Sequence, residues 1–361
     1  MSRVTQALGP LMADVAGLHL NVTEAERLCH PLIGGVILFR RNYGSPQQVA
    51  RLVASIRALR EPELLIAVDH EGGRVQRFRD GFTQIPPMRL LGAAWQDDAA
   101  AGSALAFDTG VVLAAELRAV GVDMSFAPVL DLDWGHSTII GDRSFGRDPA
   151  SVTAVAGALI RGLAARGMAN CGKHFPGHGW AVADSHHALP EDPRSYEALS
   201  AADLAPFARL VDQGLMSVMP AHLLYTAVDP LPAGFSPFWL RTVLRERLGF
   251  DGAVFSDDLS MKGAHGVGDM VERAEAAYDA GCDMVLVCND PDSVDQVLDG
   301  WQPELRPAST RRIAAMAARG PAPDTAGLAG DLQYQLALEG LQRLGESASR
   351  FAAGPAVGEA P

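Results

Sequence analysis

The segment LLIAVDHEGGRVQR (64–77) begins with a short apolar run and continues directly into a cluster of charged residues and glycines. Such a run, bounded by turn residues, is typical of a buried strand, and the same arrangement recurs along the first 290 residues. Segments of helical period separate the runs, a pattern that indicates repeated parallel βα units. The candidate strands are Leu11–Val15, Gly35–Phe39, Leu64–Val68, Asp123–Pro128, Ala169–Lys173, Ser217–Pro220, Ala253–Ser256 and Met284–Val287.

The segments between these runs carry helix signals. In 104–120, leucine and valine recur at helical spacing, and Gly121 follows as a stop signal. After about residue 303 the strand pattern ends. We expect helices at 311–318 and 331–347, joined by the Pro- and Gly-containing linker 321–330.

Eight strands with interleaved helices predict an α/β fold, namely a (β/α)8 TIM-type barrel with C-terminal helices. A doubly wound sheet would share much of this pattern. The barrel is favoured because polar clusters follow several different strands rather than one. We therefore expect a single barrel domain over 1–347 and a flexible tail over 348–361, where small residues, proline and glycine predominate.

Composition narrows the classes of function. The 361 residues include 43 acidic and 30 basic ones, giving a net charge of −13, so no basic face is available for a nucleic-acid backbone or an anionic membrane. The four cysteines match neither a disulfide framework nor a zinc ribbon. We see no secretory signal and no run near the roughly 18 apolar residues of a membrane span. We expect a cytoplasmic protein that binds neither nucleic acid nor membrane.

Five polar clusters stand just after predicted strands. In a barrel, the loops that follow the strands open on one face, so clusters more than 100 residues apart can form one pocket. This convergence is the main argument for an active site. The clusters are DHEGGRVQR (69–77), DLD (131–133) with GDRSFGRDP (141–149), KHFPGHG (173–179), DSHH (184–187) and FSDDLSM (255–261).

Asp257 and Asp258 follow an apolar strand, where an unpaired carboxylate is costly to bury. Adjacent strand residues point to opposite sides, so we expect only one of the two to reach the barrel mouth. A carboxylate there can serve as a nucleophile, a base or a metal ligand. The alternative is a structural hydrogen bond or a helix N-cap at Asp258.

Asp184 precedes His186 and His187 in a loop of turn-forming residues. An aspartate two residues from a histidine can bond the imidazole and raise its pKa, which gives a proton donor near neutral pH. The alternative is a surface loop that happens to contain histidines.

In KHFPGHG, His174 and His178 are four residues apart, but Pro176 lies between them and excludes a shared helical face. A metal site is therefore weakly signalled. Lys173, at a strand end, is a candidate hydrogen-bond donor to a ligand. For His178, a structural hydrogen bond is at least as good an interpretation as catalysis.

Two acid–base pairs admit two interpretations. Asp69 with Arg77, and Asp142 with Arg143, can be ion pairs that hold their loops. They can equally supply the acceptors and fork-shaped donors that the hydroxyls and amide oxygens of a sugar require.

Taken together, these clusters and GGVILFRRN (34–42) closely resemble the single-domain bacterial β-N-acetylglucosaminidases of glycoside hydrolase family 3, the enzymes of cytoplasmic peptidoglycan recycling. The resemblance covers the chain from roughly Gly9 to Asn289. It implies a retaining exo-β-N-acetylglucosaminidase on a (β/α)8 barrel, acting without a cofactor or metal on GlcNAc-1,6-anhydro-MurNAc with or without peptide. We expect a monomer or a weak homodimer.

The same resemblance implies roles for individual residues. It makes Asp257 the nucleophile and His186 the acid/base, with Asp184 as its partner. Two positions depart from the family pattern: Trp180 stands where a small or acidic residue is usual, and His70 replaces the usual glutamine. The implied sugar contacts are Asp69, Arg77, Arg143, Lys173 and His174.

Three rival functions remain open from the sequence. A relative with the same Asp–His pair can be a phosphorylase, which would depend on phosphate. A metal-dependent barrel amidohydrolase would use His174, His178, His222 and Asp257, and a chelator would inactivate it. A catalytically silent sugar-binding protein would have no turnover to lose.

Overall fold

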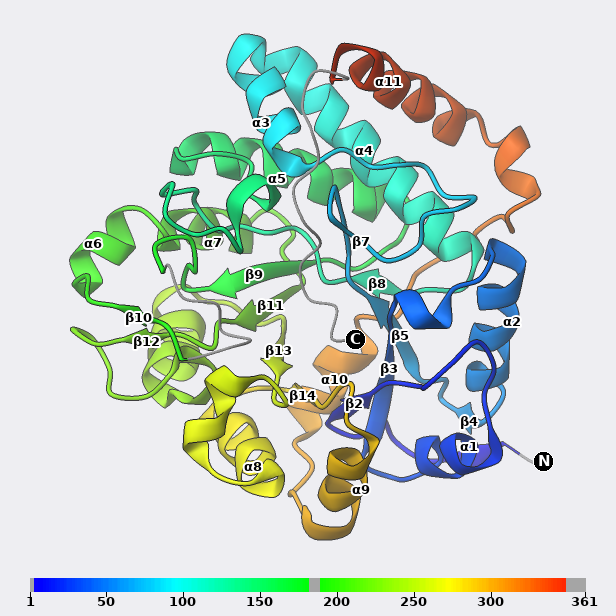
Figure 1. Ribbon diagram of the computed structural model, residues 1–361, viewed down its shortest axis with the longest axis vertical. Helices are drawn as coiled ribbons and strands as arrows, with labels where there is room; N and C mark the ends of the chain where they lie inside the picture. The colour runs from blue at the N-terminus through cyan, green and yellow to red at the C-terminus, as the bar shows by residue number, and fades with distance from the viewer. Residues whose placement is uncertain (1–2, 182–188, 349–361) are drawn as a thin grey trace.

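The computed structural model describes residues 3–181 and 189–348, and in them eight parallel strands form a barrel (Figure 1). The strands follow one another around the sheet in the order β8-β5-β3-β2-β14-β13-β11-β9, in which neighbours are hydrogen-bonded. Isolated bridges from Met124 to Ala169 and from Val129 to Lys173 join the two outer strands, so the barrel closes. The predicted (β/α)8 barrel is confirmed. The strands are β2 (Leu11–Ala13), β3 (Ile33–Leu38), β5 (Leu65–Val68), β8 (Met124–Ser125), β9 (Cys171–Phe175), β11 (Ser217–Pro220), β13 (Ala253–Asp258) and β14 (Met284–Leu286).

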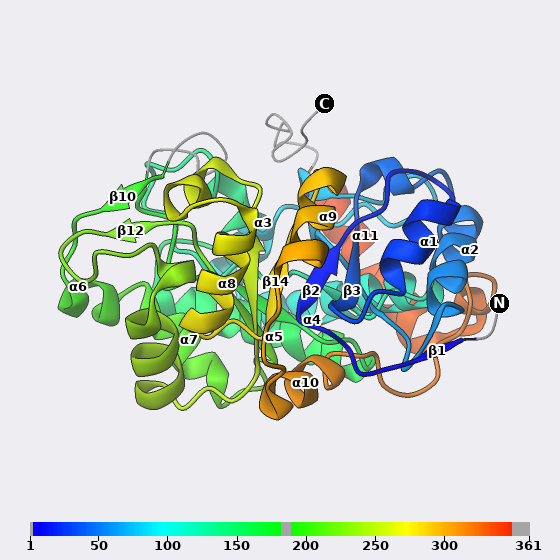
Figure 2. The same ribbon diagram turned by 90° about the horizontal axis from the view of Figure 1, so that it is seen from below.

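Helices surround the barrel, and short strand pairs and turns extend the loops (Figures 1 and 2). The helices are α1 (Val22–Leu28), α2 (Pro46–Arg57), α3 (Met88–Asp97), α4 (Ala99–Ala119), α5 (Pro149–Ala165), α6 (Tyr196–Ala201), α7 (Leu204–Val211), η4 (Phe238–Arg247), α8 (Met270–Ala280), α9 (Pro291–Gly300), α10 (Pro307–Ala314) and α11 (Leu332–Ala348). The short pairs are β1 (Val4–Thr5) with β4 (Arg60–Glu61), β6 (His70–Gly72) with β7 (Val75–Gln76), and β10 (Glu191–Asp192) with β12 (Leu224–Tyr225). The 3-10 turns are η1 (Arg40–Asn42), η2 (Gly141–Arg143), η3 (Ala233–Phe235), η5 (Lys262–Val267) and η6 (Gly327–Gly330).

The C-terminal helices follow the sequence prediction with one shift. The helix predicted at 311–318 is α10, which ends earlier, at Ala314, and begins earlier, at Pro307, because proline is preorganised for the first helical position. The predicted linker 321–330 contains the turn η6. The predicted terminal helix is α11.

Helix α10 covers the amino-terminal end of the barrel, at the bottom of Figure 2. Ser309 Oγ donates a 2.6 Å hydrogen bond to Asp283, the residue just before β14. The backbone N–H of Ala318, just after α10, donates to Asp123, the residue just before β8. Helix α10 therefore covers the amino-terminal end, and we expect the site at the carboxyl ends of the strands, as is usual for this architecture.

Side chains fill the barrel interior. Phe126 directly follows β8 and Phe255 lies on β13, two strands that are not neighbours in the sheet, yet their rings meet edge to face with centroids 5.4 Å apart. Both are fully buried. The barrel is thus a packed core rather than a channel, as is usual for this architecture.

Helix α4 corrects one expectation from the sequence. Its 21 residues are, by length and composition alone, apolar enough to cross a membrane, although the sequence had indicated no such stretch. Most of this helix is buried, and it packs against α3, α5 and α11. Its apolar character is accounted for by this packing inside the protein.

Two glycines allow α4 and α5 to cross closely. A Cβ atom at Gly110 would lie 2.3 Å from the carbonyl oxygen of Leu159, and one at Gly162 would lie 2.1 Å from that of Phe107. Real Cβ atoms do not approach backbone oxygens so closely, so any larger residue must push the two helices apart.

Gly162→Ala is therefore expected to lower the free energy of unfolding by about 2 kcal/mol, because the added methyl group overpacks the crossing. Urea denaturation followed by circular dichroism measures this change. The matched control is Gly157→Ala in the same helix, where the new Cβ would meet only side-chain ends at 3.3 Å or more. Equal losses in the two variants would contradict the close crossing.

Candidate active site

Polar side chains gather at the carboxyl ends of the barrel strands. Asp69 follows β5, and Asp131 follows the short strand β8. Lys173 and His174 lie on β9, and Asp257 lies near the end of β13. Because the strands are parallel, their carboxyl ends meet at one mouth of the barrel. The structure thus places these residues on the face opposite the end that α10 covers.

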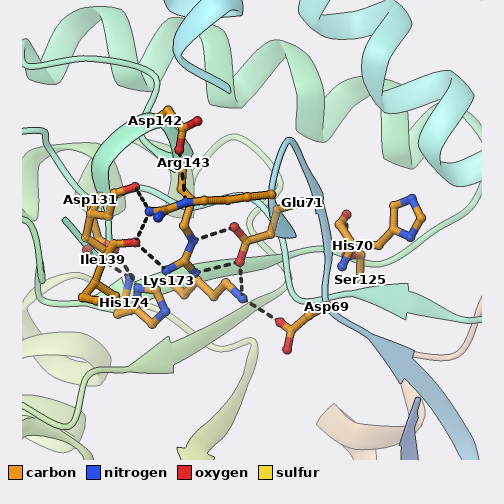
Figure 3. A network of polar contacts seen from close by, with 12 residues as sticks. Asp69, His70, Glu71, Ser125, Asp131, Ile139, Asp142, Arg143, Lys173 and His174 are labelled. Atoms are coloured by element: carbon orange, nitrogen blue, oxygen red, sulfur yellow. Dashed lines mark hydrogen bonds and ion pairs between the residues drawn. The ribbon is translucent and has the colours of Figure 1, made fainter. Parts of the chain in front are cut away.

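The centre of this mouth is a network of buried charges (Figure 3). Lys173 Nζ lies 2.8 Å from Asp69 Oδ1 and 2.7 Å from Glu71 Oε1. Arg143 donates from Nε and Nη2 to the two oxygens of Glu71, both at 2.8 Å. Glu71, Lys173 and Arg143 are each less than 9% exposed. The network therefore joins β6, β9 and η2 by direct contacts.

The pKa values show that each charged group of the network favours the ionised form of its neighbours. Burial by itself would raise the pKa of Glu71, but Arg143 and Lys173 outweigh burial and hold that pKa far below its usual value. For Asp69, Lys173 and Arg77 likewise overcome burial and lower the pKa. Burial would lower the pKa of Lys173, yet Asp69 and Glu71 raise it. These groups are consequently ionised at neutral pH.

The two acid–base pairs considered from the sequence behave differently. Arg77 Nη2 lies 3.7 Å from Asp69 Oδ2, so that pair forms. Asp142 does not pair with Arg143: its carboxylate lies 3.2 Å from Arg74 Nε, whereas Arg143 turns to Glu71. The ion-pair hypothesis for Asp142 and Arg143 is thus wrong, since these neighbours in a 3-10 turn point in different directions.

Asp131 holds the segment that begins with His174. Its Oδ2 atom lies 2.7 Å from His174 Nδ1, and its Oδ1 atom accepts from the backbone N–H groups of His174 and His178. Burial would raise the pKa of Asp131, but His174 outweighs it and the pKa is lowered. Because the carboxylate engages Nδ1, the Nε2 atom of His174 is the ring nitrogen that can contact a ligand.

The two aspartates of β13 are differently engaged. The carboxylate of Asp258 accepts from Ser260 N at 3.0 Å, Ser260 Oγ at 2.8 Å and Cys288 N at 3.1 Å, so it stabilises the turn after the strand. Burial, with a smaller contribution from Asp257, raises the pKa of Asp258 to about 7. The structural interpretation thus applies to Asp258. Asp257 accepts a 2.9 Å bond from the Asp258 backbone and lies two residues beyond the inward-facing Phe255.

The remaining histidines of the mouth lie deep. His178 is buried, and burial followed by the charge of His174 lowers its pKa. His222 Nε2 lies 3.0 Å from the carbonyl oxygen of Asp258. In residues 3–181 and 189–348, no three His, Cys, Asp or Glu side chains are arranged to hold a metal ion. The ligand set of the amidohydrolase alternative is therefore not assembled there.

Asp184 and His186 fall in 182–188 and lie outside the described residues. Trp180, just before this segment, packs against described neighbours. The Arg194 guanidinium lies 4.7 Å above the Trp180 ring and 4.8 Å above the Trp134 ring, and it also pairs with the buried carboxylate of Asp203. The departure at Trp180 is thus accommodated by a cation–π contact.

His70, the second departure from the family pattern, points away from the charge network. Its ring lies 6.0 Å from that of Phe78 and 5.8 Å from that of Phe82, and its side chain is buried. Burial, with Arg79 and Arg77 adding to it, lowers the pKa of His70 to about 3, so the ring is neutral at physiological pH. Asp69 and Glu71, its neighbours, reach the network because successive strand side chains alternate.

Sequence reasoning missed the organising roles of Glu71 and Asp131. Both stand in the quoted clusters, but nothing in the spacing shows which charged residue of a cluster is buried. The available signal was position, since each follows a strand end by only a few residues.

Comparison with known proteins identifies the family. Residues 5–315 match the glycosyl hydrolase family 3 N terminal domain. A beta-hexosaminidase of Chromobacterium violaceum is 53% identical over 352 residues, which cover 98% of each chain. Native NagZ from Neisseria gonorrhoeae is 49% identical, with a TM-score of 0.90 over 95% of this chain and 99% of that chain. The same protein has been crystallised in complex with N-trifluoroacetyl-D-glucosamine, and that structure also gives a TM-score of 0.90, at 49% identity over 94% of this chain and 99% of that chain. Because these matches extend over nearly the whole chain, the chain belongs to glycosyl hydrolase family 3, among its beta-hexosaminidases.

Proposed function

We propose that this family 3 enzyme is a retaining exo-β-N-acetylglucosaminidase of the cytoplasm. Its substrate is a peptidoglycan fragment, GlcNAc-1,6-anhydro-MurNAc with or without peptide, from which it releases the terminal N-acetylglucosamine during cell-wall recycling. The observation that carries the proposal is the presence of Asp257 at the same barrel mouth as the charge network of Asp69, Glu71, Lys173 and Arg143. The relatives named beta-hexosaminidase, and the neisserial complex with an N-acylated glucosamine, support the choice of sugar.

The charge network suits an uncharged sugar. Lys173, Arg143 and Arg77 supply N–H donors, and Asp69 supplies carboxylate acceptors, so neighbouring hydroxyls and an amide oxygen can each find a partner. His174, with its ring oriented by Asp131, adds one more polar contact. Fixed partners of this kind hold the sugar ring in the orientation that reaction requires.

The reaction then proceeds by two displacements. Asp257 attacks the anomeric carbon, while protonated His186 gives its proton to the leaving oxygen; the glycosyl–Asp257 ester forms and the glycosidic bond breaks. His186, now neutral, next takes a proton from water, which attacks the same carbon and releases Asp257. Asp184 is the proposed partner of His186, since a neighbouring carboxylate favours the protonated form of an imidazole. Two inversions retain the β configuration.

Proton NMR of the protein acting on an aryl β-N-acetylglucosaminide tests the proposal. The expected first product is β-configured N-acetylglucosamine, formed at the same rate with and without phosphate, while the matching β-glucoside is spared. A sugar phosphate would identify a phosphorylase instead. Absence of any product would favour a sugar-binding protein.

His186→Ala is expected to slow substrates with poor leaving groups much more than activated ones. An activated aryloxide needs little protonation, whereas a sugar alkoxide needs an acid, and a general acid contributes about 100- to 10,000-fold. Steady-state kinetics over a series of aryl glycosides of graded phenol pKa measures the difference. Equal losses across the series would contradict the acid role.

A further inference from the structure

Glu71 occupies a special place in the charge network. Its carboxylate lies between two cations, with Lys173 Nζ at 2.7 Å and the Arg143 nitrogens at 2.8 Å. Only 2% of the residue is exposed, so Glu71 is buried together with the two cations rather than lying on the surface of the mouth. Figure 3 shows the Arg143 fork and the Lys173 chain both turned toward it.

The position of Glu71 is fixed by its own strand. On one side of Glu71, the His70 backbone N–H donates to Ser125 Oγ at 3.0 Å, and Ser125 Oγ donates back to the His70 carbonyl at 2.9 Å. The His70 ring is buried beside two phenylalanines, as described above. On the other side, Gly72 turns the chain with a φ of 107°. Glu71 is therefore held rigidly toward the cations.

Glu71 also accepts hydrogen bonds from N–H groups of Lys173 and Arg143 that would otherwise be available to a ligand. An ammonium has three N–H groups, and Lys173 directs two of them to Asp69 and Glu71. A guanidinium has five, and Arg143 directs two to Glu71 and one to the Ile139 carbonyl oxygen at 3.2 Å. Counted over residues 3–181 and 189–348, these bonds leave one N–H of Lys173 and two of Arg143 for a ligand, in directions that Glu71 determines.

Without Glu71, the two cations Lys173 and Arg143 would be balanced by the single carboxylate of Asp69, and the excess positive charge would attract an anion. A buried lysine and arginine side by side form a strong site for phosphate, because charge-assisted bonds to both can form at once. With Glu71 present, an incoming phosphate would meet its negative charge and that of Asp69 inside the same low-dielectric pocket. An uncharged hydroxyl or amide oxygen meets no such repulsion.

We propose that Glu71 is a positioning residue that determines specificity: its carboxylate is the built-in counter-ion of Lys173 and Arg143 and aims their remaining donors at a neutral sugar instead of an anion. This inference rests on the proposed function for the identity of the sugar. The discrimination between a neutral ligand and an anion is a property of the network itself.

Glu71→Gln tests it, because glutamine keeps the size of the side chain and removes the charge. Isothermal titration calorimetry with inorganic phosphate is expected to show at least about tenfold tighter binding to this variant than to the wild type. Phosphate is expected to compete with the sugar in the variant. Adding phosphate should therefore raise the KM of Glu71→Gln for the aryl N-acetylglucosaminide about tenfold, and should leave the KM of the wild type unchanged. Unchanged phosphate affinity would overturn the proposal.

Glu71→Asp separates charge from reach and serves if the glutamine variant folds poorly. The shorter carboxylate keeps the charge, so phosphate binding is expected to stay as weak as in the wild type, while KM rises because the donors are misdirected. If Glu71→Asp binds phosphate as tightly as Glu71→Gln is expected to, the counter-ion role is refuted. The matched control is Asp283→Asn, another buried carboxylate between two arginines, Arg245 and Arg312, at the opposite end of the barrel. Because it lies away from the mouth, it is expected to leave KM for the aryl N-acetylglucosaminide unchanged, with and without phosphate.

These measurements distinguish the two proposals. If the wild type does not hydrolyse the aryl N-acetylglucosaminide, the proposed function fails, yet the calorimetric comparison of phosphate binding still tests Glu71. If the wild type is active and Glu71→Gln behaves like it in both assays, only the present inference fails.

Discussion

Asp257→Ala is expected to lower kcat/KM for an aryl β-N-acetylglucosaminide by about 10,000-fold or more, because the side chain that forms the glycosyl ester is gone. Asp257 is half-buried at the end of β13, so its loss should leave the fold intact. Initial rates with equal concentrations of wild type and variant, together with circular dichroism spectra, measure both effects.

The neighbouring aspartate provides the control. Asp258→Asn keeps the acceptors for Ser260 N and Cys288 N and keeps the backbone N–H that bonds Asp257. Its loss of activity should stay below about tenfold. Added azide should in turn restore turnover to Asp257→Ala and give the inverted glycosyl azide, since a small anion can occupy the space of the missing carboxylate. Comparable losses in the two aspartate variants would show that Asp257 has no special role.

Lys173→Met is expected to lower the free energy of unfolding by about 3 kcal/mol, because removing one partner of a buried ion pair leaves the others uncompensated. Among the residues that the structure describes, Asp69 would keep Arg77, 3.7 Å away, as its cation, and Glu71 would keep Arg143. Binding of N-acetylglucosamine should be lost as well. Urea denaturation at pH 7 and calorimetry with the sugar measure the two effects.

The chain's other lysine, the exposed Lys262, supplies the comparison, and Lys262→Met should change neither quantity. A double variant tests the coupling. When Lys173→Met is combined with Glu71→Gln, the loss of stability should be less than the sum of the single losses, because the second change removes a charge that the first left unpaired. Strict additivity would mean that the two side chains do not stabilise each other.

The strands could be predicted from sequence because each is short, apolar and followed by polar residues. All eight predicted strands are present; Ser217–Pro220 has the predicted bounds, and the others differ from the prediction by a few residues. The misplaced start of α10 has a local cause, since Pro307 begins a helix before the apolar pattern does. The apolar length of α4 was underestimated because Asp108 and Glu116 interrupt a helix that is otherwise nearly all small or apolar.

The site was only partly accessible to sequence reasoning. Asp69, Arg77, Arg143, Lys173 and His174 could be named from their clusters, and the structure brings them to one mouth. Which carboxylate accompanies which cation could not be predicted, because Arg143 reaches over 72 residues to Glu71 rather than to adjacent Asp142. The roles of Asp257, Asp184 and His186 stay predictions, the last two outside the described residues.

Closure of the barrel has a consequence for how the chain is made. The first barrel strand, β2, pairs with the last one, β14, with Leu11 opposite Val285. At a synthesis rate of about 5–20 residues per second, β14 leaves the ribosome roughly 14–55 s after β2. During that interval one edge of β2 has no strand to pair with. The nascent chain therefore carries the unpaired backbone groups and apolar side chains of β2 through most of its synthesis, and we expect chaperone binding to concentrate on chains that stop short of residue 285.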